Sequence, residues 1–121
     1  MTFYFENLAA WKKAFLLTER TFLAIKKFPK EEQYALTDQL RRCSLSIVSN
    51  IAEWSGRTSN AEYTQFLSIA KGSCMEYATQ IMLAHKFQYL TSEEYAELIE
   101  LVEEIVKIVS TMIQNNKIVH P

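Results

Sequence analysis

Apolar residues recur at three- and four-residue steps through four long segments of the chain, with polar residues between them. This is the spacing of residues along one face of an α-helix. The predicted helices span about residues 7–27, 30–54, 59–88 and 91–114, and the tail at 115–121 is expected to fray. The connections are short, and short connections make successive helices antiparallel. The pattern therefore predicts one all-α domain over the whole chain, an up-down-up-down four-helix bundle.

Local signals at the predicted helix ends support these boundaries. Ser59 with Glu62, and Thr91 with Glu94, have the spacing of capping boxes at the starts of the third and fourth helices. Gly56 is suited to a left-handed cap at the end of the second helix.

The first predicted helix shows one apolar seam, which is expected to face the core. Its members are Leu8, Trp11, Phe15, Thr18, Phe22 and Ile25.

The second predicted helix divides into three stripes when each residue is advanced by about 100°. The expected core stripe is Leu36, Leu40, Cys43, Ile47, Ile51 and Trp54. A polar stripe lies roughly 120° away from it. A second apolar stripe, Leu45, Val48 and Ala52, occupies the remaining side. A helix at the surface of a monomer should show one apolar stripe, so this second one is a candidate oligomer interface.

The fourth predicted helix is also wider in its apolar face than a single seam requires. Its apolar residues include Leu98, Ile99, Leu101, Val102, Ile105, Val106, Ile108, Val109, Met112 and Ile113. A generous core in a small monomer would explain this width. Assembly with other copies is favoured, because large exposed apolar patches are rare on soluble monomers.

Polar residues of the second and third helices form a candidate structural stripe. They are Arg42, Ser46, Ser49, Asn50 and Glu53, with Gly72, Ser73 and Glu76 expected opposite them. Small side chains would let the two helices approach closely, and Arg42 or Glu53 would pair with Glu76 or Lys71. The alternative is that the same groups line a ligand site. The structural interpretation is favoured because most buried polar groups are simply hydrogen-bonded ones.

Composition excludes several classes of protein. Only two Gly and two Pro occur, which argues against a turn-rich β fold. The 13 Lys and Arg balance 14 Asp and Glu, unlike the strongly basic profile of a dedicated nucleic-acid binder. Cys43 and Cys74 are isolated, which is typical of reduced, buried thiols. No apolar run is long enough for a membrane span and no signal layout is seen, so a cytoplasmic protein is expected.

No pattern for catalysis, a metal or a cofactor is present, because neither histidine nor cysteine has ligand spacing and no glycine-rich phosphate loop occurs. We therefore expect no catalytic residues, no metal and no cofactor. The candidate nucleic-acid contacts are the basic residues Lys12, Lys13, Arg41, Arg42, Arg57 and Lys71. A solvated basic face is the ordinary alternative.

Three segments carry a family resemblance. FPKEEQYALTDQLRR at 28–42, SIVSNIAE at 46–53 and GSCMEYATQ at 72–80 resemble the 23S rRNA-intervening sequence proteins. The resemblance implies an up-down bundle, a ring-shaped homopentamer and little known chemistry. A related member is the accessory protein of diversity-generating retroelements, which resembles a basic pentameric barrel that binds nucleic acid and a reverse transcriptase. The net charge of this chain is −1, so that activity transfers poorly to it.

The sequence thus predicts a non-enzymatic homo-oligomer, with RNA or DNA as a candidate partner. The alternative is an adaptor that docks a protein partner onto the ring. Helix two, in this interpretation, lies between its own bundle and a neighbouring copy.

Overall fold

The computed structural model describes residues 3–56 and 60–119, with side chains described at 3–56 and 64–115. The long helices are α1 (Ala9–Ala24), α2 (Leu36–Ser55), α3 (Asn60–Lys86) and α4 (Ser92–Val119). Short 3-10 turns are η1 (Tyr4–Asn7), η2 (Ile25–Lys27) and η3 (Lys30–Glu32). The described residues contain no strand, so the predicted all-α class is confirmed.

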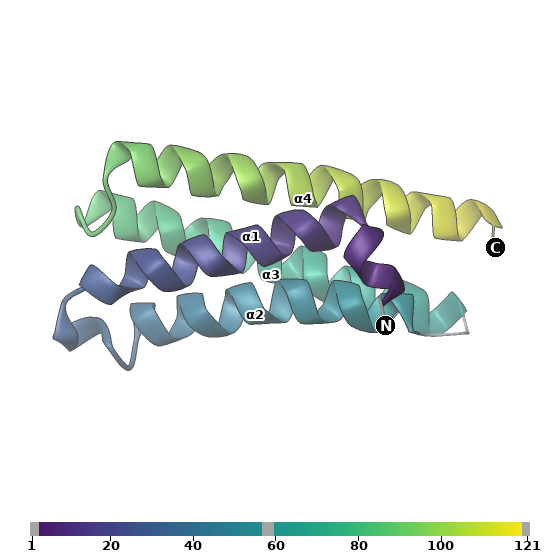
Figure 1. Cartoon of the computed structure of the whole chain (residues 1–121), viewed down its shortest axis with the longest axis horizontal. Helices are drawn as coiled ribbons and strands as arrows, with labels where there is room; N and C mark the ends of the chain where they lie inside the picture. The colour runs from purple at the N-terminus through teal and green to yellow at the C-terminus, as the bar shows by residue number, and fades with distance from the viewer. Residues whose placement is uncertain (1–2, 57–59, 120–121) are drawn as a thin grey trace.

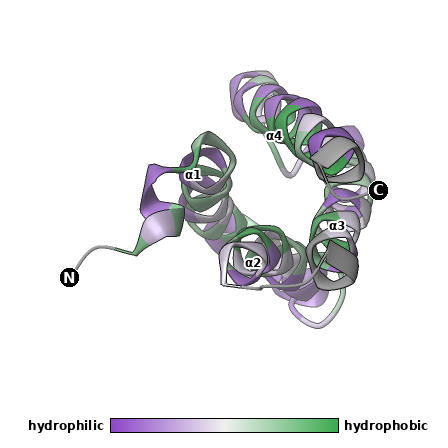
Figure 2. Ribbon diagram, turned by 90° about the vertical axis from the view of Figure 1, so that its right-hand side faces the viewer, coloured by the Kyte–Doolittle hydropathy of each residue, from purple (hydrophilic) through white to green (hydrophobic). Residues whose placement is uncertain are grey.

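The four helices lie side by side, and successive helices run in opposite directions, as Figure 1 shows. Seen along the bundle in Figure 2, α1 and α2 form one side and α3 and α4 form the opposite side. Two ion pairs between α1 and α4 show in which direction each helix runs. Lys13 Nζ lies 2.7 Å from Glu104, and Arg20 Nε lies 3.3 Å from Glu97. The α4 number falls as the α1 number rises, so these two helices are antiparallel.

The core face of α1 differs from the predicted seam. The buried residues of α1 are Ala10, Ala14, Leu17, Thr21 and Ala24. Phe15 is 46% exposed, while Thr18 and Phe22 are only half-buried. The prediction was therefore wrong for the centre of this seam. Small alanines let α1 pack closely on its neighbours, and the bulky rings that dominate the apolar pattern are left outside.

The expected core stripe of the second helix is confirmed. Leu40, Cys43, Ile47 and Ile51 are buried, while Leu36 and Trp54 are partly buried against them. α4 buries Leu98, Leu101, Val102, Ile105 and Val109. Five further apolar residues are partly buried against this core, namely Ile99, Val106, Ile108, Met112 and Ile113.

Helix α2 begins at Leu36, six residues later than predicted. Residues 30–35 bury no side chain, so nothing anchors an earlier helical turn against the bundle. The residue that follows this helix, Gly56, has φ −95° and ψ 1°, which is not the left-handed cap that was expected.

The other helix ends differ less. α3 ends at Lys86, where Gln88 takes φ 65° and the Tyr89 N–H donates to the Ala84 carbonyl at 2.8 Å. The Thr91–Glu94 capping box is confirmed, with the Glu94 N–H on Thr91 Oγ1 at 3.1 Å and the Thr91 N–H on Glu94 Oε1 at 2.8 Å. The predicted Ser59 cap lies outside the described residues.

The C-terminal helix is longer than predicted. α4 continues to Val119, into the tail that was expected to fray. Residues 115–119 contain neither Gly nor Pro, so nothing in their sequence interrupts the helical hydrogen bonds.

Candidate functional site

The small polar residues of α2 and α3 form a hydrogen-bonded seam between the two helices. Ser46 Oγ and Ser73 Oγ lie 2.8 Å apart. Asn50 Nδ2 donates to the Ser46 carbonyl at 2.7 Å, and the Cys43 thiol donates to the Ser73 carbonyl at 3.1 Å. These groups satisfy one another, which agrees with the structural interpretation of the stripe. Ser49 is exposed beside them.

The charged members of that stripe do not lie in the bundle interior. Arg42 Nε pairs with Asp38, one turn earlier on α2, at 2.9 Å. Glu53 and Glu76 are both exposed. The expected pairing of Arg42 with α3 was therefore wrong, because the carboxylate at the i−4 position is nearer.

Gly72 does not mark a close approach within the chain. It is exposed, and a Cβ built there would meet nothing within 4 Å. A mid-helix Gly costs about 1 kcal/mol relative to Ala. The predicted reason, contact with α2, was wrong, and the fold of one chain offers no other reason.

One buried polar contact was not predicted from the sequence. Tyr77 on α3 is fully buried, and its hydroxyl lies 2.5 Å from Thr21 Oγ1 on α1. Thr21 also donates to the Leu17 carbonyl at 2.6 Å, so the Tyr77 O–H is the donor to Thr21. Burial raises the pKa of Tyr77 well above its usual range. The sequence signal for this contact is weak: Thr21 follows Leu17 by four residues, so the two lie on the same face of the helix.

Both cysteines are buried free thiols. Burial raises the pKa of Cys43 to about 11, and the nearby carboxylate of Glu76 adds to the rise. Burial raises the pKa of Cys74 to about 12. Both therefore stay protonated near neutral pH and are poor nucleophiles.

The candidate nucleic-acid contacts do not form one surface. Lys13 pairs with Glu104 on α4. Arg41 and Arg42 share Asp38, and Arg41 also lies over the Phe22 ring at 5.8 Å. Lys12 and Lys71 are exposed on different helices and make no ion pair with any described residue. Arg57 lies outside the described residues.

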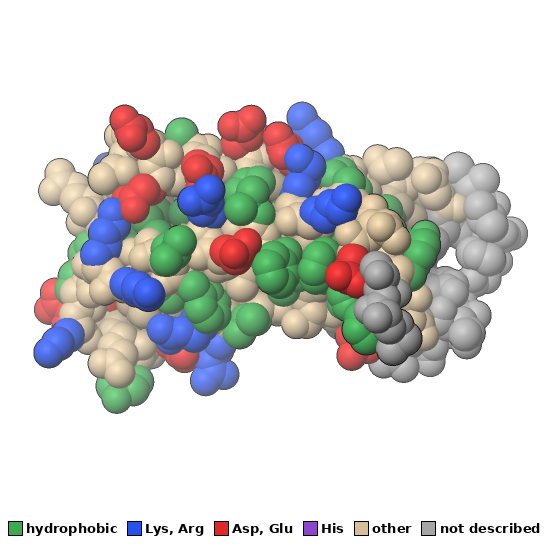
Figure 3. All heavy atoms as spheres, in the orientation of Figure 1, with side chains coloured by type: hydrophobic (Ala, Val, Ile, Leu, Met, Phe, Trp, Pro, Cys, Tyr) green, Lys and Arg blue, Asp and Glu red, His purple; other side chains and the backbone are tan. Residues whose placement is uncertain are grey.

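A shallow apolar groove lies between the outer faces of α1 and α2. It has a volume of about 490 Å³. Its apolar lining is Phe15, Phe22, Leu23, Leu45 and Val48. Leu45 is 44% exposed, and Val48 and Ala52 are half-buried. Figure 3 shows apolar side chains along this face, with basic and acidic side chains beside them.

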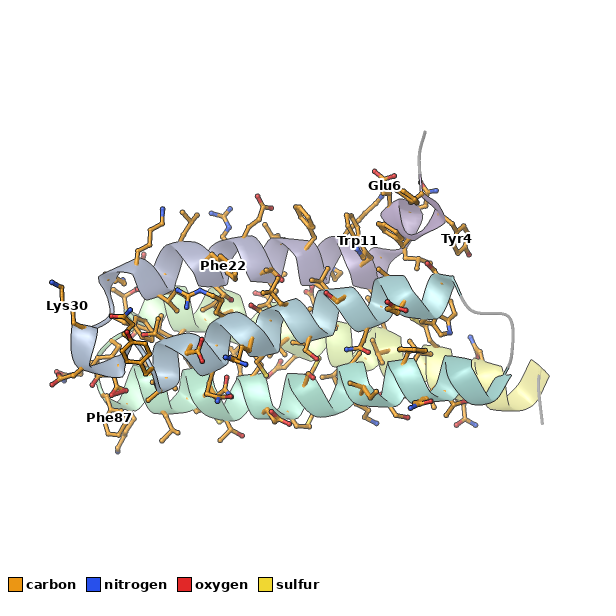
Figure 4. The ribbon with its side chains drawn as sticks, turned by 90° about the horizontal axis from the view of Figure 1, so that it is seen from below. Tyr4, Glu6, Trp11, Phe22, Lys30 and Phe87 are labelled. Atoms are coloured by element: carbon orange, nitrogen blue, oxygen red, sulfur yellow. The ribbon has the colours of Figure 1, made fainter. Side chains whose placement is uncertain are left out.

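The aromatic residues that precede this groove form a continuous row. Ring centroids are 5.2 Å apart for Phe3 and Phe5, 5.1 Å for Phe5 and Trp11, and 5.0 Å for Trp11 and Phe15. In Figure 4, Trp11 and Phe22 lie on α1, and Tyr4 and Glu6 lie in η1 at its N-terminal end. The row therefore extends the apolar α1/α2 face beyond the helix.

A second apolar groove, of about 300 Å³, lies on the opposite side of the bundle between α3 and α4. Its apolar lining is Cys74, Met75, Ala78, Met82, Ile99, Val102 and Val106. Met75 and Met82 are about half exposed, at 49% and 51%. Further exposed apolar residues follow the outer face of α3, namely Ile69, Leu83 and Phe87. Three residues of the wide apolar face predicted for the fourth helix therefore lie at this groove, namely Ile99, Val102 and Val106.

Comparison with known proteins identifies the family. The profile of the 23S rRNA-intervening sequence protein family matches residues 6–111. The chain belongs to this family. A solved member of the S23 ribosomal protein family from Bacteroides thetaiotaomicron, described as a protein of unknown function, has the same fold. Its TM-score is 0.80 at 24% identity, with 87% of this chain and 95% of that chain covered.

No curated protein matches the chain significantly. The name of this family gives no activity, so the function of the protein is inferred from the exposed surfaces of its bundle. Among the described residues, no group of three side chains could hold a metal ion, and no helix has the length and apolarity of a membrane span.

Proposed function

We propose that this protein is a non-catalytic assembly protein that functions as a homo-oligomer, with five copies in a ring. The observation that supports it is the exposure of apolar side chains on two opposite sides of the bundle, exemplified by Leu45 and Met82. Contiguous exposed apolar patches mark interaction sites on soluble proteins. The number five follows from the family resemblance. The buried, protonated thiols fit a protein without nucleophilic chemistry, and a cytoplasmic location suits their reduced state.

Light scattering after gel filtration tests this proposal. Five copies of the 14.1 kDa chain give a mass of about 70 kDa. Leu45→Glu and Val48→Glu place a charge in the interface and should reduce the mass to that of one chain, with unchanged helical circular dichroism. Leu45→Met keeps the side chain apolar and should retain the full mass. An unchanged mass in both Glu variants contradicts the proposal.

Nucleic-acid binding is a second candidate role, supported by one cluster near the α1–α2 connection. Arg41 and Arg42 share the single carboxylate of Asp38, which leaves the group with a net positive charge. Tyr34, in the turn before α2, is 89% exposed and is available for stacking on a base. Lys30 lies at the same end of the bundle in Figure 4. Cyclic symmetry would repeat this cluster at one height around a ring, so weak single contacts would add.

Fluorescence anisotropy with a structured large-subunit rRNA fragment tests this second role. Binding should weaken steeply between 50 and 200 mM salt, because phosphate contacts release counterions. Arg42→Ala and Tyr34→Ala should weaken it, and Lys71→Ala should not. No binding at low salt contradicts the role. Salt-insensitive co-purification of one protein would instead support the adaptor alternative.

A further inference from the structure

We propose that an open cavity at one end of the bundle binds a nucleoside monophosphate, a ligand that combines a phosphate with a planar base. The cavity lies where the end of α1 meets the α3–α4 connection, and Figure 1 shows both segments at the same end of the bundle. It shares no lining residue with the two apolar grooves. The proposal therefore stands apart from the homo-oligomer and is tested separately.

The size of the cavity fits a small metabolite. Its volume is about 800 Å³, within the roughly 300–1,000 Å³ that is usual for ligand sites. Lys27 and Pro29 border it from the α1 side, and the other lining residues fall within 85–92. The lining combines charged, hydroxyl, amide and aromatic side chains, whereas the two grooves described above are mainly apolar.

The charged side chains of the lining are all basic. Lys27 and Lys86 border the cavity, and no Asp or Glu is among its lining residues, all of which the structure describes. Lys27 is already paired with Glu94 on α4, whereas Lys86 makes no ion pair with a described residue. A phosphate in the cavity would give Lys86 the partner that its own chain does not provide, and a lysine ammonium is a usual phosphate ligand.

Hydroxyl and backbone donors at the start of α4 lie beside these charges. Thr91 and Ser92 line the cavity, and Ser92 is the first residue of the helix. N–H groups in the first turn of a helix have no partner within it, and this end of a helix attracts anions. Glu93 and Glu94 share that turn, but neither lines the cavity. The Glu94 carboxylate is already occupied by Lys27 and by the Thr91 N–H.

Two rings in the lining are available for stacking on a planar base. Tyr89 is half-buried, and its ring lies against those of Phe28 and Phe87, with centroids 5.4 and 5.9 Å away. His85 is stacked on Tyr95, with ring centroids 4.4 Å apart and an angle of 7° between the rings. Neighbours thus hold both rings in place before a ligand arrives, which lowers the entropy lost on binding. Stacking of this kind accepts any base, because every base has a π face.

Gln88 supplies an independent observation. It follows α3 with φ 65°, a left-handed conformation in which glycine is the usual residue. The turn is closed by a hydrogen bond from the Tyr89 N–H to the Ala84 carbonyl at 2.8 Å, and this bond needs no side chain at position 88. The Gln88 side chain is exposed and lines the cavity. An amide both donates and accepts hydrogen bonds, so recognition of a base edge gives this side chain a reason.

Isothermal titration calorimetry with the four ribonucleoside 5′-monophosphates tests the proposal. At least one should bind with a Kd at or below about 1 mM. The matching nucleoside and inorganic phosphate each keep only part of the contacts, so each should bind about tenfold more weakly or not at all. Lys86→Glu should weaken binding of the monophosphate by about tenfold, because it places a carboxylate beside the phosphate. Lys71→Glu is the matched control, an exposed position on the same helix outside the cavity, and should bind as the wild type does.

Gln88→Gly separates binding from folding. Glycine adopts the left-handed conformation without strain, so the variant should unfold at a higher temperature than the wild type. It loses the amide, so its affinity for the monophosphate should fall severalfold. A change that merely damaged the fold would lower both quantities together.

Three results overturn the proposal. They are the absence of binding by any monophosphate at millimolar concentration, inorganic phosphate that binds as tightly as the best monophosphate, and binding that is unchanged in both Lys86→Glu and Gln88→Gly. If Lys86→Glu loses its helical circular dichroism, Lys86→Ala replaces it. Light scattering of the same samples reports on the homo-oligomer, so failure of either claim is distinguishable from failure of the other.

Discussion

Tyr77 on α3 and Thr21 on α1 share a hydrogen bond of 2.5 Å at the centre of the bundle, across two helices that are diagonal to one another (Figure 2). Both side chains are buried, at 0% and 1% exposure. The hydroxyl of Tyr77 has no contact with bulk water, so this bond is what satisfies it. It links α1 to α3 across the core.

Removal of the Tyr77 hydroxyl should therefore lower stability. Tyr77→Phe keeps the ring and loses the bond, and we expect the free energy of unfolding to fall by about 1 kcal/mol. Urea denaturation followed by circular dichroism measures it. Tyr34→Phe is the matched control, because Tyr34 is exposed and should show no change. Equal stability of the two variants would contradict the role given to the bond.

Gly72→Ala should stabilise the chain. Ala should stabilise α3 by about 0.5–1 kcal/mol, because the site is open and helical. The measurement is thermal unfolding of Gly72→Ala in the Leu45→Glu background, in which assembly is expected to be lost. A lower unfolding temperature for Gly72→Ala in that background would contradict the open site.

The buried cysteines predict a specific response to pH. Both thiols have a pKa raised from an ordinary value of 9.0, to about 11 for Cys43 and about 12 for Cys74. The folded state holds these protons more tightly than the unfolded state does. The stability that the two protonated thiols contribute to the folded state is therefore complete below pH 9, and it is lost as the pH rises toward 11 and 12.

A thiol reagent at pH 8 checks this prediction. The native protein should react slowly at both cysteines, and two thiols per chain should react at once in denaturant. The urea midpoint should also fall between pH 9 and pH 11, and the fall should be smaller in a Cys43→Ala, Cys74→Ala variant. Rapid labelling of the native protein would show that the thiols are not held as described.

The helices and their order could be predicted from periodicity alone, because four amphipathic segments with short connections leave few other arrangements. The face of α1 could not. Phe15 and Ala14 are neighbours in the sequence, and a prediction based on hydrophobicity places the larger residue, Phe15, in the core. In the folded chain Ala14 is inside and Phe15 is outside, because close helix packing selects small residues.

The candidate site was predictable in part. The serines at 46 and 73 were expected to meet, and they do. The ion pair of Arg42 was assigned to the wrong helix, since a helical wheel gives the direction of a side chain and not the choice between local and distant partners. The α3/α4 groove could not be predicted, because the apolar residues of α3 are spread around the helix and show little periodic contrast with the polar ones.

The mass of the wild-type protein, measured by light scattering beside Leu45→Glu and Val48→Glu, tests the central claim most directly. The account predicts an assembled wild type of about 70 kDa and two variants at 14.1 kDa. A wild-type protein that elutes as a single chain at every concentration would contradict it.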